Sequence, residues 1–171
     1  MTGAVVNEEV AVQDVDIIVS RSDAKGKITY GNQIFFKLSG YSQAELLDQP
    51  HSILRHPDMP KIIFKFFWDS LQAGHDVLAF VKNLRKDGKY YWVLANVKVT
   101  KNPDGSFRNY VSTRRKMSEE AKKTIEPLYA TLLEAEKEGG IEASLKILND
   151  FLTANGSSLA GFNELMKKIQ G

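Results

Sequence analysis

Residues 77–115 read VLAFVKNLRKDGKYYWVLANVKVTKNPDGSFRNYVSTRR, and this stretch decides the fold. Within residues 90–100 the side chains alternate between two sets, one of which begins Tyr91, Val93 and Ala95. A period of two residues is that of a β-strand with two different faces. Asp-Gly pairs at residues 87–88 and 104–105 are typical of hairpin turns. The stretch therefore predicts three antiparallel strands, at 77–84, 90–100 and 107–115.

The preceding residues predict two more strands and a block of helices. Two β-branched runs, at 16–20 and 27–30, flank a turn at residues 23–26 and indicate a hairpin. Short helices are expected at 32–40 and 42–47, and an amphipathic helix is expected at 59–71, ending before Gly74. A helical block must cover one apolar face of the sheet. The predicted fold class is α+β, a five-stranded antiparallel sheet with helices over one face.

The two ends of the chain flank this unit. We divide the sequence into an N-terminal cap at 1–14, a sensory domain at 15–116 and a C-terminal helical extension at 117–171. In the cap, Val5, Val6, Val10 and Val12 are expected to pack on the domain or on a second copy. In the extension, helices are expected at 118–139, 141–154 and 159–169, with Pro127 breaking or kinking the first.

Composition excludes several classes of protein. The chain has 171 residues, a formal net charge of +2 and no cysteine. Disulfides, thiolate metal sites and a covalent flavin–cysteine adduct are therefore excluded. The charge is too balanced to predict nucleic-acid binding, and no apolar run is long enough for a membrane span. We expect a cytoplasmic protein.

A proline-rich connector at residues 50–60 carries the first candidate site. Its three prolines stiffen it, and Arg55, His56 and Asp58 lie close together within it. Such a segment suits the rim of a ligand pocket. In the simpler interpretation, Asp58 caps the following helix, Arg55 pairs with Asp58, and His56 is merely packed.

The order of many short motifs resembles the PAS domain of the Aer-type aerotaxis receptors. The resemblance runs from about residue 15 to Arg115, continues at 126–129, and is carried by these residues: Asn32, Phe35, Ser39-Gly40-Tyr41, Glu45-Leu46, Pro50-His51, Arg55-His56-Pro57-Asp58-Met59-Pro60, Trp68, Val81-Lys82-Asn83, Lys86-Asp87-Gly88, Tyr91-Trp92-Val93 and Ala95-Asn96.

This resemblance implies a sensory domain without enzymatic activity, which binds FAD non-covalently and reports redox state or oxygen to the chemotaxis machinery. Arg55, His56, Asp58 and Asn83 match positions important for flavin binding in that family. The resemblance also makes Trp68, Asn32, Tyr91 and Val77 candidates for the cofactor pocket. The family has a tryptophan at the position of Val77 and an acidic residue at that of Lys65.

Two other functions remain open at this stage. A haem-based gas sensor would need an axial ligand, for which His51, His56 and His75 are the candidates. A ligand-free interaction module would fill its pocket with side chains such as Val77, Leu78 and Phe80. No nucleophile motif, phosphate-binding glycine loop or helical metal spacing indicates an enzyme. In each case the signal is expected to pass through residues 118–170 to a second copy or to a signalling partner. The apolar stripe of these residues includes Leu145 and Leu148.

Overall fold

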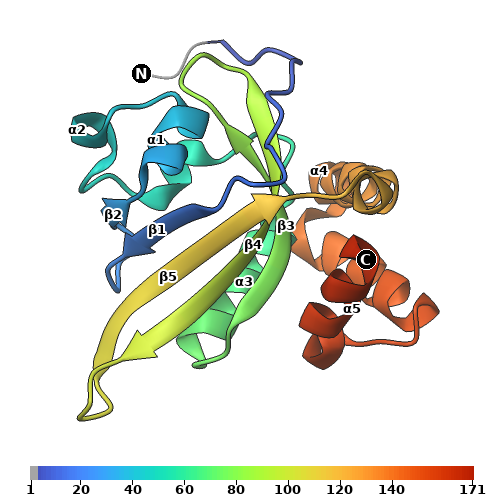
Figure 1. Cartoon of the computed structure of the whole chain (residues 1–171). Coiled ribbons are helices and arrows are strands. Elements are labelled where there is room, and N and C mark those ends of the chain that lie inside the picture. The colour runs from blue at the N-terminus through green and yellow to red at the C-terminus, as the bar shows by residue number, and fades with distance from the viewer. Residues whose placement is uncertain (1–3) are drawn as a thin grey trace.

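The sheet predicted from the alternating pattern is confirmed. The computed structural model describes residues 4–171 and contains one five-stranded sheet in the order β2-β1-β5-β4-β3 (Figure 1). All four neighbouring pairs are antiparallel. The strands are β1 (Ile18–Ser22), β2 (Ile28–Gly31), β3 (Val77–Leu84), β4 (Tyr90–Lys101) and β5 (Phe107–Lys116).

Helices between β2 and β3 cover one face of this sheet, as expected. They are α1 (Gln33–Ser39), α2 (Gln43–Leu46), the short 3-10 helix η1 (His51–Leu54) and α3 (Lys61–Gln72). The capping box predicted at Ser42 and Glu45 is present at the start of α2. Helix α3 begins after Pro60, and Asp58 does not cap it. The simpler interpretation of the connector is therefore wrong on this point.

The C-terminal extension folds back onto the opposite face of the sheet beside β3 and β4 (Figure 1). It consists of α4 (Glu119–Ala154), the short 3-10 helix η2 (Leu159–Gly161) and α5 (Phe162–Gln170). Trp92 on β4 contacts the ring of Tyr129 on α4, with 5.9 Å between centroids. Leu148 is fully buried and Leu145 is partly buried. The apolar stripe of the extension is thus buried within this chain.

The break expected at Pro127 was wrong, because α4 runs through this residue with helical backbone angles. Pro127 lacks the N–H that would bond to the carbonyl of Lys123, and both residues are exposed, so water can solvate that carbonyl. The helix bends at Gly140, between the helices predicted at 118–139 and 141–154, and the φ of 72° and ψ of −168° at this residue are accessible only to glycine. Among the described residues, no helix has both the length and the apolar character needed to cross a membrane.

The N-terminal segment lies along the hairpin between β3 and β4. Glu9 forms a parallel bridge with Tyr90, and the Val10 amide donates to the Tyr90 carbonyl at 2.8 Å. Val12 is buried and Val10 packs against the core, whereas Val5 and Val6 are exposed. Only half of the predicted valine face therefore packs on the domain.

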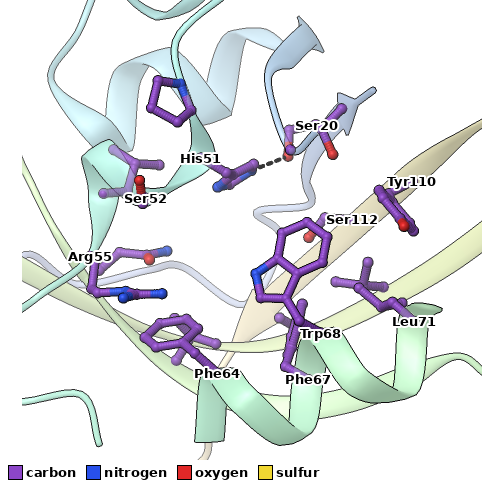
Figure 2. Close-up of a pocket in the computed structure, with 18 of the residues that line it drawn as sticks. Ser20, His51, Ser52, Arg55, Phe64, Phe67, Trp68, Leu71, Tyr110 and Ser112 are labelled. Atoms are coloured by element: carbon purple, nitrogen blue, oxygen red, sulfur yellow. Dashed lines mark hydrogen bonds between the residues drawn. The ribbon is translucent and has the colours of Figure 1, made fainter. Parts of the chain in front are cut away.

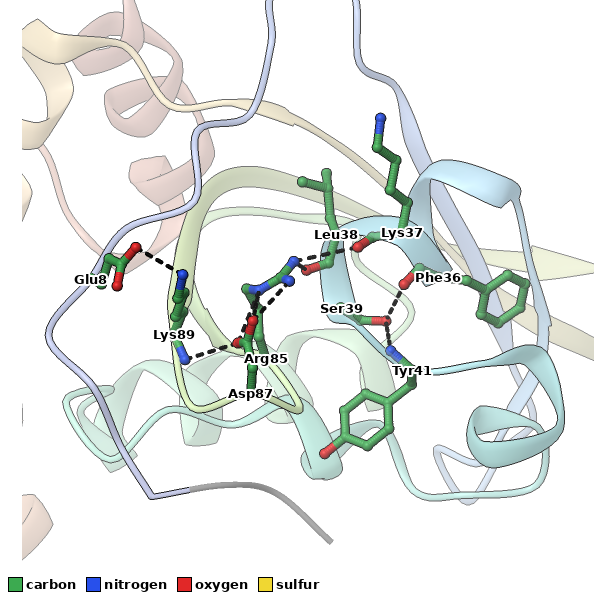
Figure 3. A network of polar contacts seen from close by, with 9 residues as sticks. All are labelled: Glu8, Phe36, Lys37, Leu38, Ser39, Tyr41, Arg85, Asp87 and Lys89. Carbon is green, nitrogen blue, oxygen red and sulfur yellow. Dashed lines mark hydrogen bonds and ion pairs between the residues drawn. The ribbon is translucent and has the colours of Figure 1, made fainter.

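Figure 3 shows how the same hairpin is fixed to both the N-terminal segment and α1. Lys89 pairs with Glu8 at 2.8 Å, and its amide donates to the carboxylate of Asp87. Arg85 pairs with Asp87 at 3.0 Å and also donates to the carbonyls of Lys37 and Leu38 in α1. This hairpin thus connects two segments that are distant from it in sequence, the N-terminal segment and α1.

Asn32 fixes α1 to β1. Its Oδ1 accepts from the amides of Phe35 and Val19, both at 3.1 Å, and its Nδ2 donates to the Ile17 carbonyl at 2.8 Å. We predict that Asn32→Ala lowers the free energy of unfolding by about 1–3 kcal/mol, because it removes a helix cap and two further hydrogen bonds. Urea denaturation measures this loss. Asn149→Ala, at an exposed position of α4, is the control, and equal stabilities of the two variants would contradict the prediction.

Candidate functional site

A cavity of about 320 Å³ lies between α3, η1 and the sheet (Figure 2). This volume is at the lower end of the range of small-molecule sites. One side of α3 supplies Phe64, Phe67, Trp68 and Leu71. Their spacing of three and four residues places them on one helix face. Phe66 belongs to another face of α3 and contacts Phe162 of the extension, with 4.5 Å between ring centroids.

The sheet supplies the opposite wall through the alternation of its strands. The lining residues alternate along each strand: Ser20 and Ser22 in β1, Val81 and Asn83 in β3, Ala95 and Val97 in β4, and Tyr110, Ser112 and Arg114 in β5. The cavity is therefore apolar on its helical side and has polar groups on its sheet side, which is typical of a site that orients a small-molecule ligand.

The polar end of the cavity is built by Arg114, Ser20 and His51. Arg114 Nη2 donates to Ser20 Oγ at 2.7 Å, and Ser20 Oγ lies 2.9 Å from His51 Nε2. Arg114 Nη1 lies 3.4 Å from the same nitrogen. Because the arginine only donates, this arrangement fits an unprotonated Nε2. Burial and the nearby Arg114 guanidinium lower the pKa of His51 to about 3.

Arg114 is a buried cation without an anionic partner. It is 3% exposed, its Nε has no hydrogen-bond partner, and its guanidinium lies 4.8 Å from the centroid of the Phe35 ring. Burial lowers its pKa to about 10, which leaves it charged at neutral pH. A buried charge without a partner is costly.

The other charged residues of the cavity have the same sign. Lys25 and Arg55 also line it, and its lining contains no Asp or Glu. Arg55 is exposed, and its guanidinium lies 4.0 Å from the centroid of the Phe64 ring. Across residues 4–171, neither Lys25, Arg55 nor Arg114 forms a salt bridge. The cavity thus offers positive charge and hydrogen-bond donors to a ligand.

Three of the predicted site residues line the cavity: Arg55, Asn83 and Trp68. Asn83 is buried and forms a backbone bridge with Arg55. Tyr91, Val77 and Asn32 do not line it. Tyr91 lies opposite Asn83 in the β3–β4 pair, and its buried hydroxyl lies near the Asn83 side chain without a hydrogen bond of normal geometry.

The remaining predicted residues, His56 and Asp58, do not line the cavity; Asp58 pairs instead with Lys82, and His56 packs against Tyr90. Lys82 neighbours Val81 and Asn83 in β3 and therefore points to the opposite face. Asp58 pairs with Lys82 at 2.8 Å, and Lys82 Nζ lies 4.1 Å from the centroid of the Tyr90 ring. The His56 ring meets the Tyr90 ring edge-on, at 5.7 Å between centroids. The connector thus passes from the cavity around β3 to the other face of the sheet.

These contacts set the charge states on that face. Burial lowers the pKa of His56, and Lys82 adds to this effect. Partial burial opposes ionisation of Asp58, but the hydrogen bond and charge of Lys82 hold the pKa of Asp58 below its usual value. The pairing of Arg55 with Asp58 in the simpler interpretation was wrong, because Lys82 is the partner of Asp58.

The sequence prediction of the cofactor pocket missed Arg114, Ser20 and Lys25. The sequence did contain a signal for Arg114. Tyr110, Ser112 and Arg114 are alternate residues of one strand, so they lie on the same face of the sheet. His51 was named only as a haem candidate, and it lines the cavity, whereas His75 is exposed. Leu78 and Phe80 were expected to fill a ligand-free pocket, but they do not line the cavity. They lie on the same face of β3 as Lys82, which points away from the cavity. Within the described chain no three His, Cys, Asp or Glu residues form a group that could hold a metal ion.

The low pKa of His51 gives a testable result. We predict that the His51 ring stays neutral from pH 8 down to about pH 4, because the folded pKa is about 3. The unfolded chain binds this proton below about pH 6.5, so His51 costs about 2 kcal/mol of stability by pH 5. NMR titration of the three histidines measures the protonation. Exposed His75 serves as the internal control, and a midpoint near 6.5 for His51 would contradict the prediction.

Comparison with known proteins adds family relationships to this geometry. The family model described as the PAS fold matches residues 28–114, which is just over half of the chain. The aerotaxis receptor of Escherichia coli (strain K12) is 38% identical over 128 residues, covering 75% of this chain and 25% of the receptor. A nitrogen fixation regulatory protein of Klebsiella pneumoniae is 30% identical over 107 residues, covering 63% of this chain and 22% of that protein. The chain thus spans about a quarter of the length of these relatives.

Solved structures have the same architecture. The dark structure of the blue-light photoreceptor Aureochrome1 LOV aligns with a TM-score of 0.55 and 28% identity, covering 71% of this chain and 84% of that one. A light-oxygen-voltage domain studied with a flavin analogue aligns with a TM-score of 0.55 and 25% identity, covering 71% of this chain and 85% of that one. The likeness therefore extends to the arrangement of sheet and helices.

Proposed function

Because the chain belongs to the PAS-fold family, we propose that it is a sensory domain that binds FAD non-covalently and reports redox state or oxygen. The observation that carries this proposal is the charge of the cavity: Lys25, Arg55 and Arg114 line it without any carboxylate. FAD combines an aromatic ring system, which suits the face of Phe64, Phe67 and Trp68, with an anionic pyrophosphate that needs cations.

The similarity to an aerotaxis receptor and to a flavin-containing domain supports the same ligand. Asn83 would donate to and accept from the edge of the isoalloxazine ring, and Trp68 would form part of the wall beside it. Arg55, at the exposed rim, would bind the pyrophosphate. His56 and Asp58 would act indirectly, by holding the connector that carries Arg55.

Bound flavin supplies reversible electron transfer, and reduction changes the charge of the ring. Arg114 lies in the cavity without a counter-charge, so it favours whichever ligand state is more negative. Asn83 can respond by rearranging its amide hydrogen bonds. A difference of about 1–3 kcal/mol between two conformations is enough to transmit such a change.

We also propose that the domain is a non-enzymatic sensor in the cytoplasm. It would work as a homodimer or through a signalling partner, as in chemotaxis. Light scattering at several protein concentrations tests the dimer, and capture of chemotaxis proteins tests the partner. Haem remains the second candidate ligand, because His51 lines the cavity.

The absorbance spectrum of the freshly purified protein tests the ligand. Flavin bands, and release of FAD on heating, would support the proposal, whereas a Soret band would select haem. A colourless protein that binds no FAD on titration would overturn the proposal and leave an interaction module.

Arg114 gives a sharper test, because ligand binding and stability should respond in opposite directions. We predict that Arg114→Met weakens FAD binding by more than tenfold, and raises the stability of the ligand-free protein by about 1–3 kcal/mol, since a buried unpaired charge is removed. Isothermal titration and urea denaturation measure the two effects. Arg115→Met, at the adjacent exposed position, is the control. Loss of stability in the ligand-free Arg114→Met protein would contradict this account of the cavity.

A further inference from the structure

Glu136 of α4 caps the helix that forms one wall of the cavity. Its carboxylate accepts hydrogen bonds from the amides of Lys61 and Ile62, each at 2.9 Å. These are the first two residues of α3, which follows Pro60 and has no side-chain cap of its own. The first amides of a helix need acceptors, and negative charge there is favoured by the helix dipole. A residue 75 positions away in sequence therefore completes α3.

The same carboxylate joins the two halves of α4. Ser144, beyond the bend at Gly140, donates its hydroxyl to Glu136 Oε1 at 3.2 Å. Lys61, Ile62 and Ser144 thus share one carboxylate. Movement of the N-terminus of α3 would therefore disturb the contact between the two halves of α4.

The extension also holds the free edge of β3. Asn163 of α5 accepts from the Leu78 amide at 2.9 Å and donates to the Asp76 carbonyl at 2.8 Å. The hydroxyl of Tyr129 donates to the Phe80 carbonyl at 2.7 Å. Since β3 is the last strand of the sheet, these groups have no neighbouring strand to bond. The extension is therefore bonded to two elements that line the cavity, α3 and β3.

We propose that Glu136 is a positioning residue that couples the docking of the C-terminal extension to the position of α3 in the cavity wall. A ligand that shifts α3 changes how firmly α5 holds β3, and release of the extension loosens α3. The ligand side of this coupling rests on the proposed function, whereas the link between α3 and the extension is a property of the chain alone. By linkage, the factor by which a bound ligand changes the docking equilibrium of the extension equals the factor by which docking changes the ligand affinity.

Amide hydrogen exchange of the ligand-free protein tests the link. Loss of a helix cap costs about 1 kcal/mol, so Glu136→Ala should speed exchange of the Lys61 and Ile62 amides by about fivefold. Coupling requires that the distant Leu78 amide and the amides of α5 also exchange faster, by about threefold or more. A merely local cap would leave Leu78 and α5 unchanged, and this result would overturn the proposal. Glu138→Ala, exposed on the same helix, is the matched control.

Asn163→Ala tests the link from the other end. It removes the bonds of α5 to β3 without touching α3, and should speed exchange at Lys61 and Ile62. Protection of these amides equal to that of the unaltered protein would contradict the coupling. Because Asn163→Ala leaves Glu136 in place, this variant also guards against a folding defect specific to Glu136→Ala.

Titration with FAD separates this inference from the proposed function. If FAD binds and α5 exchange changes by a given factor, Glu136→Ala should change the FAD affinity by a comparable factor. Binding of FAD with equal affinity to both proteins would overturn the ligand side of the coupling and leave the proposed ligand untouched. Failure of FAD to bind the unaltered protein would overturn the proposed ligand alone, and the exchange rates at Leu78, Lys61 and Ile62 would still decide the coupling.

Discussion

The alternation of side chains along β3 is the constraint on which the rest of the structure depends. Val81 and Asn83 face the cavity, so Lys82 and Phe80 must face the other way. The cavity side needs a helical cover that leaves room for a ligand. The other side exposes Phe80 and Leu94 unless something covers it, and both are buried because the extension lies there. One strand therefore fixes the place of both the site and the extension.

The second half of the proline-rich connector, residues 55–60, is arranged by the same alternation. It passes around the edge of the sheet, with Arg55 bridged to Asn83 on one side and Asp58 paired with Lys82 on the other. The motif that forms a single cluster in sequence is thus divided between the two faces of one strand. Its stiffness is useful here, because prolines hold the backbone while its side chains serve different faces.

Electrostatics explains why the cavity would select an anionic ligand. Arg114 is kept in the interior with partial hydrogen bonding and without a counter-charge, and His51 beside it is neutral. Such an arrangement lowers the stability of the ligand-free chain, and a ligand with negative charge would recover what was lost. Under the proposed function, ligand binding and the stability of the ligand-free chain place opposite demands on Arg114.

Elements whose signals are local could be predicted from the amino-acid sequence. The period of two in β4, the Asp-Gly turns, the capping box at Ser42 and the stripe of α3 all depend on residues within one turn or one strand, and each was found where predicted. The alternation along β5 also indicates that Arg114 lies on the cavity face of the sheet. The resemblance to aerotaxis receptors placed Arg55, Asn83 and Trp68, which all line the cavity.

Which of these residues meet depends on the complete fold. Asp58 is close to Arg55 in sequence but bonds Lys82, and α3 is capped by Glu136 instead of a neighbour. Pro127 was expected to break or kink a helix, because the sequence shows that it lacks an N–H donor. The helix continues through it because the freed carbonyl lies at an exposed position, and this exposure depends on the fold. Hydrogen bonds and charges are satisfied by whichever groups the fold brings within about 3 Å, and such distances are set by the whole chain.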